Sequence, residues 1–192
     1  HRLIRRQRQM CIRDRCNIVC DGASAIIFAS AEKAEKVTKT PVYLEGIGST
    51  VTHFSLMNEP DLTRMAYEKT SEEAYKNAGV GPEDIDIVEL YDSYPIFLLL
   101  QLEGMGFCER GKAGKFVMEG NTWPGGKLPM TTNGGMLCEG HLGGGGGTSL
   151  LAETVRQLKG ECDERQVKDA KRALLTGMGG QYMDSQVTIW GR

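Results

Sequence analysis

The alternation of short apolar runs with helical stripes is the feature that most limits what this chain can fold into. The run IDIVELY at 85–91 is mostly apolar, as a parallel strand covered on both faces should be. Residues 59–79, just before it, carry apolar or small side chains at helical spacing and stop at Gly79. The runs at 173–180 and 185–191 read as two strands joined by a glycine turn, expected to pair antiparallel. Alternating strands and helices predict an α/β layered fold.

The rest of the chain supplies further elements and one boundary. A boundary is expected between about Thr38 and Pro41, because proline lacks an amide donor and restricts the residue before it. The expected elements are a buried strand within 17–29, an exposed helix at 30–40 that Pro41 ends, a strand at 41–51 that leaves the core at Gly46, a buried helix at 95–106, a glycine-rich loop at 109–130 and a helix at 150–160.

Composition excludes some functions. The 192 residues carry a net charge of −2 with interspersed signs, so no nucleic-acid partner is expected. No apolar run reaches the roughly 18 residues of a membrane span. Six cysteines at irregular spacing form neither a zinc pattern nor a disulfide framework, which favours free thiols and a cytoplasmic setting. Residues 1–15 are rich in arginine and resemble a translated sequencing adapter, so they are excluded from the fold.

Three loops are expected at the carboxyl ends of strands or the entries to helices, where open α/β sheets bind ligands. They are ELYDSYP at 89–95, TNGGMLCEGH at 132–141 and LTGMGGQYMD at 175–184. His141 is a candidate acid or base, or a structural hydrogen-bonded residue. Tyr91 is a candidate proton donor or a packed phenol, and Asp92 a site carboxylate or a cap of the following helix. Cys138 is a candidate nucleophile, but packing is the favoured interpretation.

In this order the three loops resemble the C-terminal half of the thiolase superfamily. NGGMLCEGH is similar to the Asn-x-x-Gly-Gly segment that ends in Gly-His-Pro, and ELYDSYP to the Asn-Glu-Ala-Phe or His-Asp-Cys-Phe loop. DGASAIIFASAEKAEK resembles the last strand and helix of the N-terminal thiolase domain. The resemblance is strongest to lipid-transfer-protein-like thiolases and implies a mixed sheet covered by helices. It assigns residues 16–40 to the end of an incomplete N-terminal domain and 41–192 to the C-terminal domain.

The resemblance implies chemistry at a carbon–carbon bond next to a coenzyme A thioester, which is a substrate. No covalently bound cofactor and no metal is implied. An upstream Cys would take the acyl group, while the Gly-His loop stabilises an oxyanion. The implied catalytic residues are His141, Tyr91 and Asp92. The implied substrate-binding residues are Asn133, Gly134, Gly135, Gly140, Gly179 and Gly180.

Two departures from the family pattern qualify this expectation. Leu142 stands where thiolases have Pro, and no Cys occurs around Thr176–Gly177, where ordinary thiolases use a second Cys as acid or base. We therefore expect a thiolase-like acyltransferase acting on a lipid or steroid side-chain acyl group. The alternatives are a retro-aldolase acting on β-hydroxyacyl-CoA, with tyrosine as acid or base, and a non-catalytic acyl-CoA or lipid-binding module.

The same resemblance predicts the assembly. We expect a homodimer and a small OB-fold, zinc-ribbon-like partner protein. The chain is expected to be a fragment without the nucleophile, inactive by itself and poorly soluble because an apolar face is exposed.

Overall fold

The structure, a computed structural model, describes residues 16–59, 61–64, 66–180 and 184–192. Four strands form one mixed sheet in the order β1-β4-β3-β2. They are β1 (Tyr43–Val51), β2 (Ile87–Glu89), β3 (Arg172–Gly179) and β4 (Asp184–Gly191). Strand β4 pairs antiparallel with both β1 and β3, whereas β2 runs parallel to β3. The predicted antiparallel pairing of the last two strands is confirmed.

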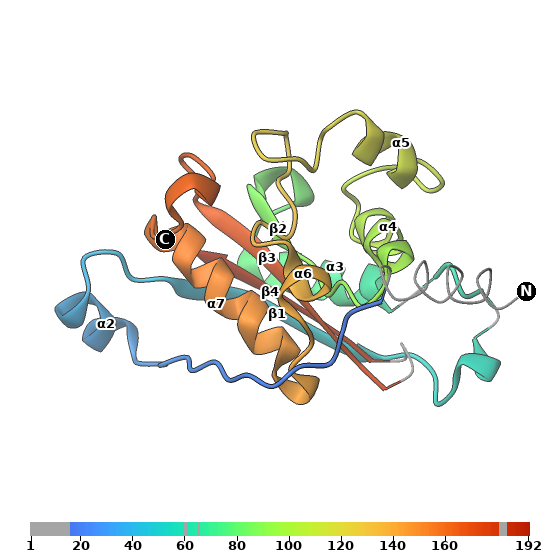
Figure 1. Cartoon of the computed structure of the whole chain (residues 1–192), viewed down its shortest axis with the longest axis horizontal. Coiled ribbons are helices and arrows are strands. Elements are labelled where there is room, and N and C mark those ends of the chain that lie inside the picture. The colour runs from blue at the N-terminus through green and yellow to red at the C-terminus, as the bar shows by residue number, and fades with distance from the viewer. Residues whose placement is uncertain (1–15, 60, 65, 181–183) are drawn as a thin grey trace, which may run out of the picture.

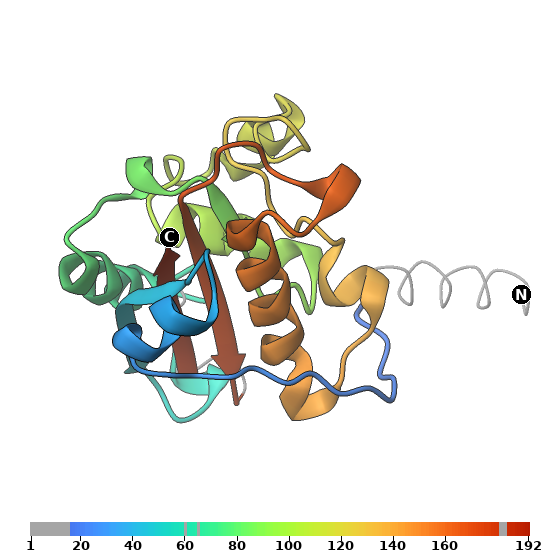
Figure 2. The same ribbon diagram turned by 90° about the vertical axis from the view of Figure 1, so that its left-hand side faces the viewer.

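Helices α3 (Tyr67–Ala78) and α7 (Gly146–Lys159) cover opposite faces of this sheet (Figure 1; Figure 2). Alternate residues of the central strands explain why, since successive side chains of a strand point to opposite faces. Leu174 and Ile189 lie in the core that contains α3. Their neighbours Leu175 and Trp190 lie in the core that contains α7. The predicted α/β layered fold, a mixed sheet covered by helices, is confirmed.

The remaining helices follow the expected order with shifted bounds. Helix α3 starts at Tyr67 rather than near residue 59, and Leu62 of its predicted apolar stripe is 59% exposed. Met65 of the same stripe lies outside the described residues. The loop at 109–130 contains a short helix. The other helices are α2 (Ala31–Val37), α4 (Pro95–Gly104), α5 (Ala113–Met118), α6 (Gly135–Glu139) and the 3₁₀ turns η1 (Leu56–Asn58), η2 (Pro82–Asp84), η3 (Gly143–Gly145) and η4 (Asp163–Arg165).

The prediction that β1 leaves the core at Gly46 is wrong. The register with β4 shifts between Leu44 and Gly46, and the strand then continues to Val51. Gly46 and Gly48 are both buried beneath α3. A Cβ on Gly48 would lie 2.1 Å from the carbonyl oxygen of Thr70. The glycines are therefore required because the helix backbone rests directly on the strand.

The predicted strand within 17–29 is also wrong. This segment forms only an isolated bridge between Val19 and His141 and then runs extended along α7 to α2 (Figure 1). Ile27 is 93% exposed, and Phe28 reaches the ring of Trp190 at a centroid distance of 6.1 Å. A β-strand needs a neighbouring strand for its amides. Within the described residues no strand pairs with residues 21–29.

The domain boundary near residues 38–41 stays a prediction. Over the described ranges, the helices are all too short or too polar to cross a membrane.

We predict that Gly48→Ala destabilises the protein by about 1–3 kcal/mol, because the added methyl group displaces α3 from β1. Urea unfolding followed by circular dichroism would measure the loss. Gly114→Ala is the matched control. It lies in α5, and a Cβ added there would have no heavy atom within 4 Å, so its stability should stay unchanged or rise slightly. Equal stability of the two variants would contradict the close contact of α3 with β1.

Candidate active site

The three predicted loops meet at one edge of the sheet. Strands β1 and β3 both run antiparallel to β4, and β2 runs parallel to β3. The carboxyl ends of β1, β2 and β3 therefore share an edge, where ligands bind in open α/β sheets. Residues 89–95 leave β2 there, and Gly179–Gly180 end β3. Residues 181–183 of the predicted closing loop lie outside the described residues.

Tyr91 and His141 are in direct contact at this edge. The Tyr91 hydroxyl lies 2.7 Å from Nε2 of His141, and the two rings meet edge to face with centroids 6.0 Å apart. The amide of Gly143 donates to Nδ1 of His141 at 3.2 Å. In the neutral ring the proton is therefore on Nε2, which donates to the Tyr91 oxygen. This arrangement leaves the phenolic proton of Tyr91 available to a substrate.

Three hydrogen bonds fix the backbone of Tyr91. Its amide donates to Oγ1 of Thr176 at 2.8 Å, and its carbonyl accepts from Nε2 of Gln101 at 2.9 Å. The Thr176 hydroxyl donates to Oε1 of Gln101 at 2.6 Å and closes the ring. Burial, followed by the charge of Asp92, raises the pKa of Tyr91 above its usual value. The phenol is thus neutral at physiological pH.

Asp92 holds the start of α6 in place. Its two carboxylate oxygens accept the amides of Met136 and Leu137, each at 2.9 Å. The side chain is 1% exposed, and burial raises its pKa despite the lowering effect of these two amides. The interpretation of Asp92 as a cap of the following helix is wrong, because the helix it caps is 44 residues away. The hydrogen bonds of the Asp92 carboxylate go to this loop, while its charge also acts on the pKa of the neighbouring Tyr91.

The glycines of the 132–141 loop are explained by close contacts. A Cβ on Gly135 would lie 2.2 Å from Oδ2 of Asp92, and one on Gly140 would lie 2.4 Å from Sγ of Cys20. Gly134, at φ 92°, and Gly135, at φ 65°, also adopt left-handed backbone conformations. Oδ1 of Asn133 accepts the amide of Gly135 at 2.9 Å. Their role in substrate binding stays a prediction, as does that of Gly179 and Gly180.

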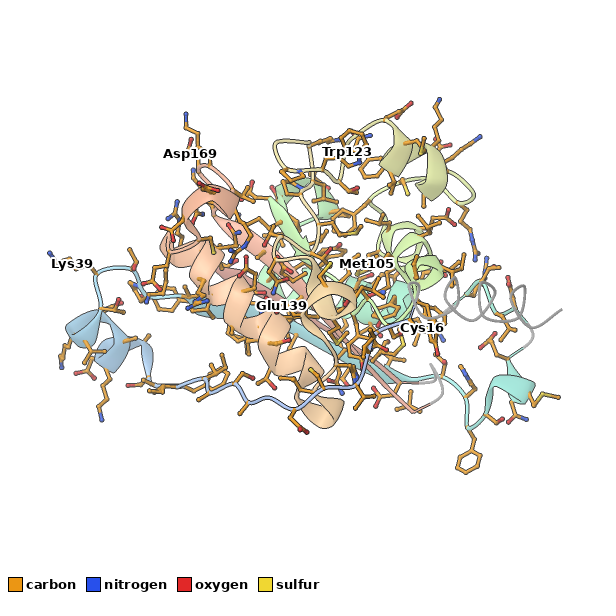
Figure 3. All side chains as sticks on the ribbon, viewed as in Figure 1. Cys16, Lys39, Met105, Trp123, Glu139 and Asp169 are labelled. Atoms are coloured by element: carbon orange, nitrogen blue, oxygen red, sulfur yellow. The ribbon has the colours of Figure 1, made fainter. Side chains whose placement is uncertain are left out.

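His141 is also fixed through its main chain. Its amide donates to the carbonyl of Ile18 at 2.7 Å, and its carbonyl accepts the amide of Cys20 at 3.1 Å. Glu139, labelled in Figure 3, ends α6 two residues before the histidine. Gly146 lies on the other side, where a Cβ would be 3.2 Å from Cδ2 of His141. The main chain of His141 is therefore held by Ile18 and Cys20, while its ring lies against the backbone of Gly146.

Sequence reasoning missed Gln101 and the role of Thr176. Both are fully buried. A single amide side chain within the apolar helix PIFLLLQLEG was an available signal for Gln101, since a buried polar group needs partners.

Of the described cysteines, Cys20 contributes to this arrangement through its amide, which donates to the carbonyl of His141. Cys138 is exposed, so the packing interpretation is wrong. The five described cysteines are free thiols, as expected. Across the part of the chain that the structure describes, no group of three His, Cys, Asp or Glu side chains is placed to hold a metal ion.

The mixed sheet covered by helices, with a glycine loop at its edge, is the fold of a thiolase-type domain. Residues 48–192 match the family described as "Thiolase C-terminal domain-like". The chain belongs to this family.

Three relatives show which members of this family the chain resembles. It is 35% identical to acetyl-CoA acetyltransferase of Methanothermobacter thermautotrophicus over 92% of this chain and 46% of that protein. It is 34% identical to 17-hydroxy-3-oxo-4-pregnene-20-carboxyl-CoA lyase of Mycobacterium tuberculosis over 73% of this chain and 37% of the lyase. The solved structure "Ltp2-ChsH2(DUF35) aldolase" superposes with a TM-score of 0.76 at 30% identity, over 84% of this chain and 42% of that one. The chain thus spans less than half the length of these relatives.

We predict that Asp92→Asn destabilises the protein by about 1–3 kcal/mol at pH 7. An amide presents one oxygen and one NH₂ group to two amide donors, so one buried N–H loses its acceptor. Chemical unfolding would measure this loss. The control is Asp169→Asn, at an exposed position with φ 58° that Asn tolerates. If Asp92→Asn matched the wild type, Asp92 would not anchor α6.

Proposed function

We propose that the protein containing this chain breaks or forms a carbon–carbon bond next to a coenzyme A thioester, with Tyr91 as the proton donor. The observation that carries this proposal is the 2.7 Å contact between the Tyr91 hydroxyl and Nε2 of His141. The pair offers an oriented O–H group at the carboxyl edge of the sheet. A donor aimed at a developing oxyanion contributes roughly 3–4 kcal/mol to catalysis.

Retro-aldol cleavage of a β-hydroxyacyl-CoA is the reaction that this site supports best. In that reaction a water molecule takes the proton of the β-hydroxyl, which becomes a carbonyl, and the bond between the α and β carbons breaks; the proton that the α-carbon then takes up balances the one lost. The electron pair passes to the α-carbon and the thioester oxygen as an enolate, which then takes up a proton at the α-carbon. Tyr91 would donate to the enolate oxygen, with the Nε2 proton of His141 supporting its hydroxyl.

The position of Thr176 favours this reaction over ordinary thiolase chemistry. A Claisen reaction must remove a proton from carbon, which calls for a strong base such as a thiolate. Here the hydroxyl of Thr176 is fully buried and bonded to Gln101 and to the amide of Tyr91. A neutral hydroxyl that is held in this way is too weak a base for that step, so proton exchange rests on Tyr91. Likeness to the steroid-CoA lyase and to the aldolase structure supports the same reaction.

Acyl transfer of the thiolase type is the second candidate. It is supported by the 35% identity to acetyl-CoA acetyltransferase over nearly the whole chain. A lipid or steroid side-chain acyl group is the proposed substrate for either reaction.

We also propose that the protein pairs with a small partner protein, because the aldolase structure is named as a complex of Ltp2 with ChsH2. A homodimer and a cytoplasmic location stay proposals of the same kind.

We predict that Tyr91→Phe and His141→Ala each lower turnover by about 100-fold or more in the protein that includes the upstream half. Cleavage of a branched β-hydroxyacyl-CoA and of acetoacetyl-CoA would be measured side by side. Tyr94→Phe is the matched control, because Tyr94 is 40% exposed and its ring packs edge to face against Phe97.

The substrate profile separates the candidates. Cleavage of the β-hydroxyacyl ester alone supports the aldolase, and cleavage of acetoacetyl-CoA supports the thiolase. Binding of acyl-CoA with no turnover of either substrate would overturn the catalytic proposal in favour of a carrier.

A further inference from the structure

Glu89, the last residue of β2, is a buried acid that the proposed reaction does not use. It is 0% exposed. Its Oε1 accepts the amide of Thr132 at 3.1 Å and lies 2.7 Å from the hydroxyl of the same residue. Its Oε2 is buried without a hydrogen-bond partner. The acid therefore faces the first residues of the glycine loop, 132–141. Its Oε1 has hydrogen-bond partners there, whereas its Oε2 has none.

The hydroxyl of Thr132 lies between two acids. It is 2.7 Å from Oε1 of Glu89 and 2.9 Å from Oε1 of Glu153 in α7. A threonine hydroxyl has one proton, so it can donate to only one carboxylate. The second contact is a hydrogen bond only if one of the two acids carries a proton. With both acids ionised, the second contact would bring a lone pair of the Thr132 hydroxyl against a lone pair of a carboxylate oxygen, away from water.

The surroundings decide which acid holds the proton. Glu153 faces a cation and an amide, since Nη2 of Arg165 lies 3.3 Å from its Oε2 and Nε2 of Gln157 donates to its Oε1 at 3.1 Å. The thiol of Cys162 is 3.6 Å from the same oxygen. Among the residues that the structure describes, the charges that act on Glu89 are those of Glu153 and Asp92, both negative. Glu89 is therefore the protonated member.

We propose that Glu89 is a positioning residue that holds the glycine loop against β2 only while it is protonated. A neutral carboxyl can accept the Thr132 amide and donate to the Thr132 hydroxyl, which in turn donates to Glu153. Loss of the proton sets two carboxylates against one hydroxyl and loosens the loop at Thr131, which has a left-handed φ of 45°. This inference deepens the proposed function, because the loop carries His141, but its test needs no turnover.

The expected pH range follows from the burial of the acid. Burial is the largest cause that raises the pKa of Glu89 from 4.5 to about 8, with the hydrogen bonds of Thr132 acting in the opposite direction. A pKa raised by folding means that the unfolded chain ionises first. The stability contributed by protonated Glu89 is therefore complete below about pH 4.5 and is lost as the pH rises through about 8.

The test compares wild type with Glu89→Gln, which keeps an oxygen acceptor for Thr132 and is neutral at every pH. The melting temperature of the protein that includes this chain and the upstream half would be measured from pH 5 to 9. We expect the melting temperature of Glu89→Gln to rise relative to wild type with pH, by at least about 4 °C over this range. Glu72→Gln, at an exposed site of α3, is the matched control and should follow the wild-type curve.

Two further readouts test the proton and the loop. An infrared carbonyl band of a buried carboxylic acid should be present in wild type at pH 6.5, fade through about pH 8 and be absent in Glu89→Gln. Hydrogen exchange of residues 131–137, corrected for its intrinsic pH dependence, should speed up above that pH in wild type only.

Parallel melting curves for wild type and Glu89→Gln, or a carbonyl band that persists in Glu89→Gln, would overturn the proposal. If Glu153→Gln rather than Glu89→Gln removed the band, the proton would belong to Glu153. Neither result depends on whether the protein is an aldolase, a thiolase or a carrier.

Discussion

The two hydrogen bonds from the amides of Met136 and Leu137 to Asp92 are the interaction on which the site depends. They join the end of β2 to a loop that follows more than 40 residues later in the chain. The carboxylate occupies the space that a side chain on Gly135 would need, so the glycine and the acid require each other. His141 follows this anchor within one short helix, and Tyr91 precedes it by one residue. The distance between the imidazole and the phenol is therefore set by the hydrogen bonds of Asp92, which involve neither side chain.

The same strand end holds the loop at a second point through Glu89 and Thr132. Fixing a loop at both ends reduces the number of conformations open to the residues between them, and this lowers the entropy lost when a substrate binds. A third constraint comes from outside, where Ile18 and Cys20 hydrogen-bond to the main chain of His141. The segment that carries them runs across the molecule without forming a strand. It serves to hold the histidine rather than to extend the sheet.

Local pattern was sufficient to predict the layered fold and the edge of the sheet at which the loops lie. Strand β2, the β3–β4 pair and the end of α3 at Gly79 all follow from periodicity and glycine stops. Partners that are distant in sequence could not be predicted. Nothing near Asp92 indicates that it caps α6, and nothing near Gly48 indicates that a helix backbone lies 2.1 Å from its Cβ position. The strand prediction at 17–29 was wrong for a related reason. An apolar run indicates a strand only where another strand is available to pair with it.

The closed ring of Tyr91, Gln101 and Thr176 has an evolutionary consequence. Replacing Thr176 alone by cysteine, which would install a thiol at this place, removes a strong hydroxyl partner from both the Tyr91 amide and the Gln101 side chain. Sulfur is a weak donor and a weak acceptor, so the mutant would leave buried polar groups poorly paired. A cysteine at this place would therefore need compensating changes in helix α4 and strand β3, because both contribute polar groups to the ring.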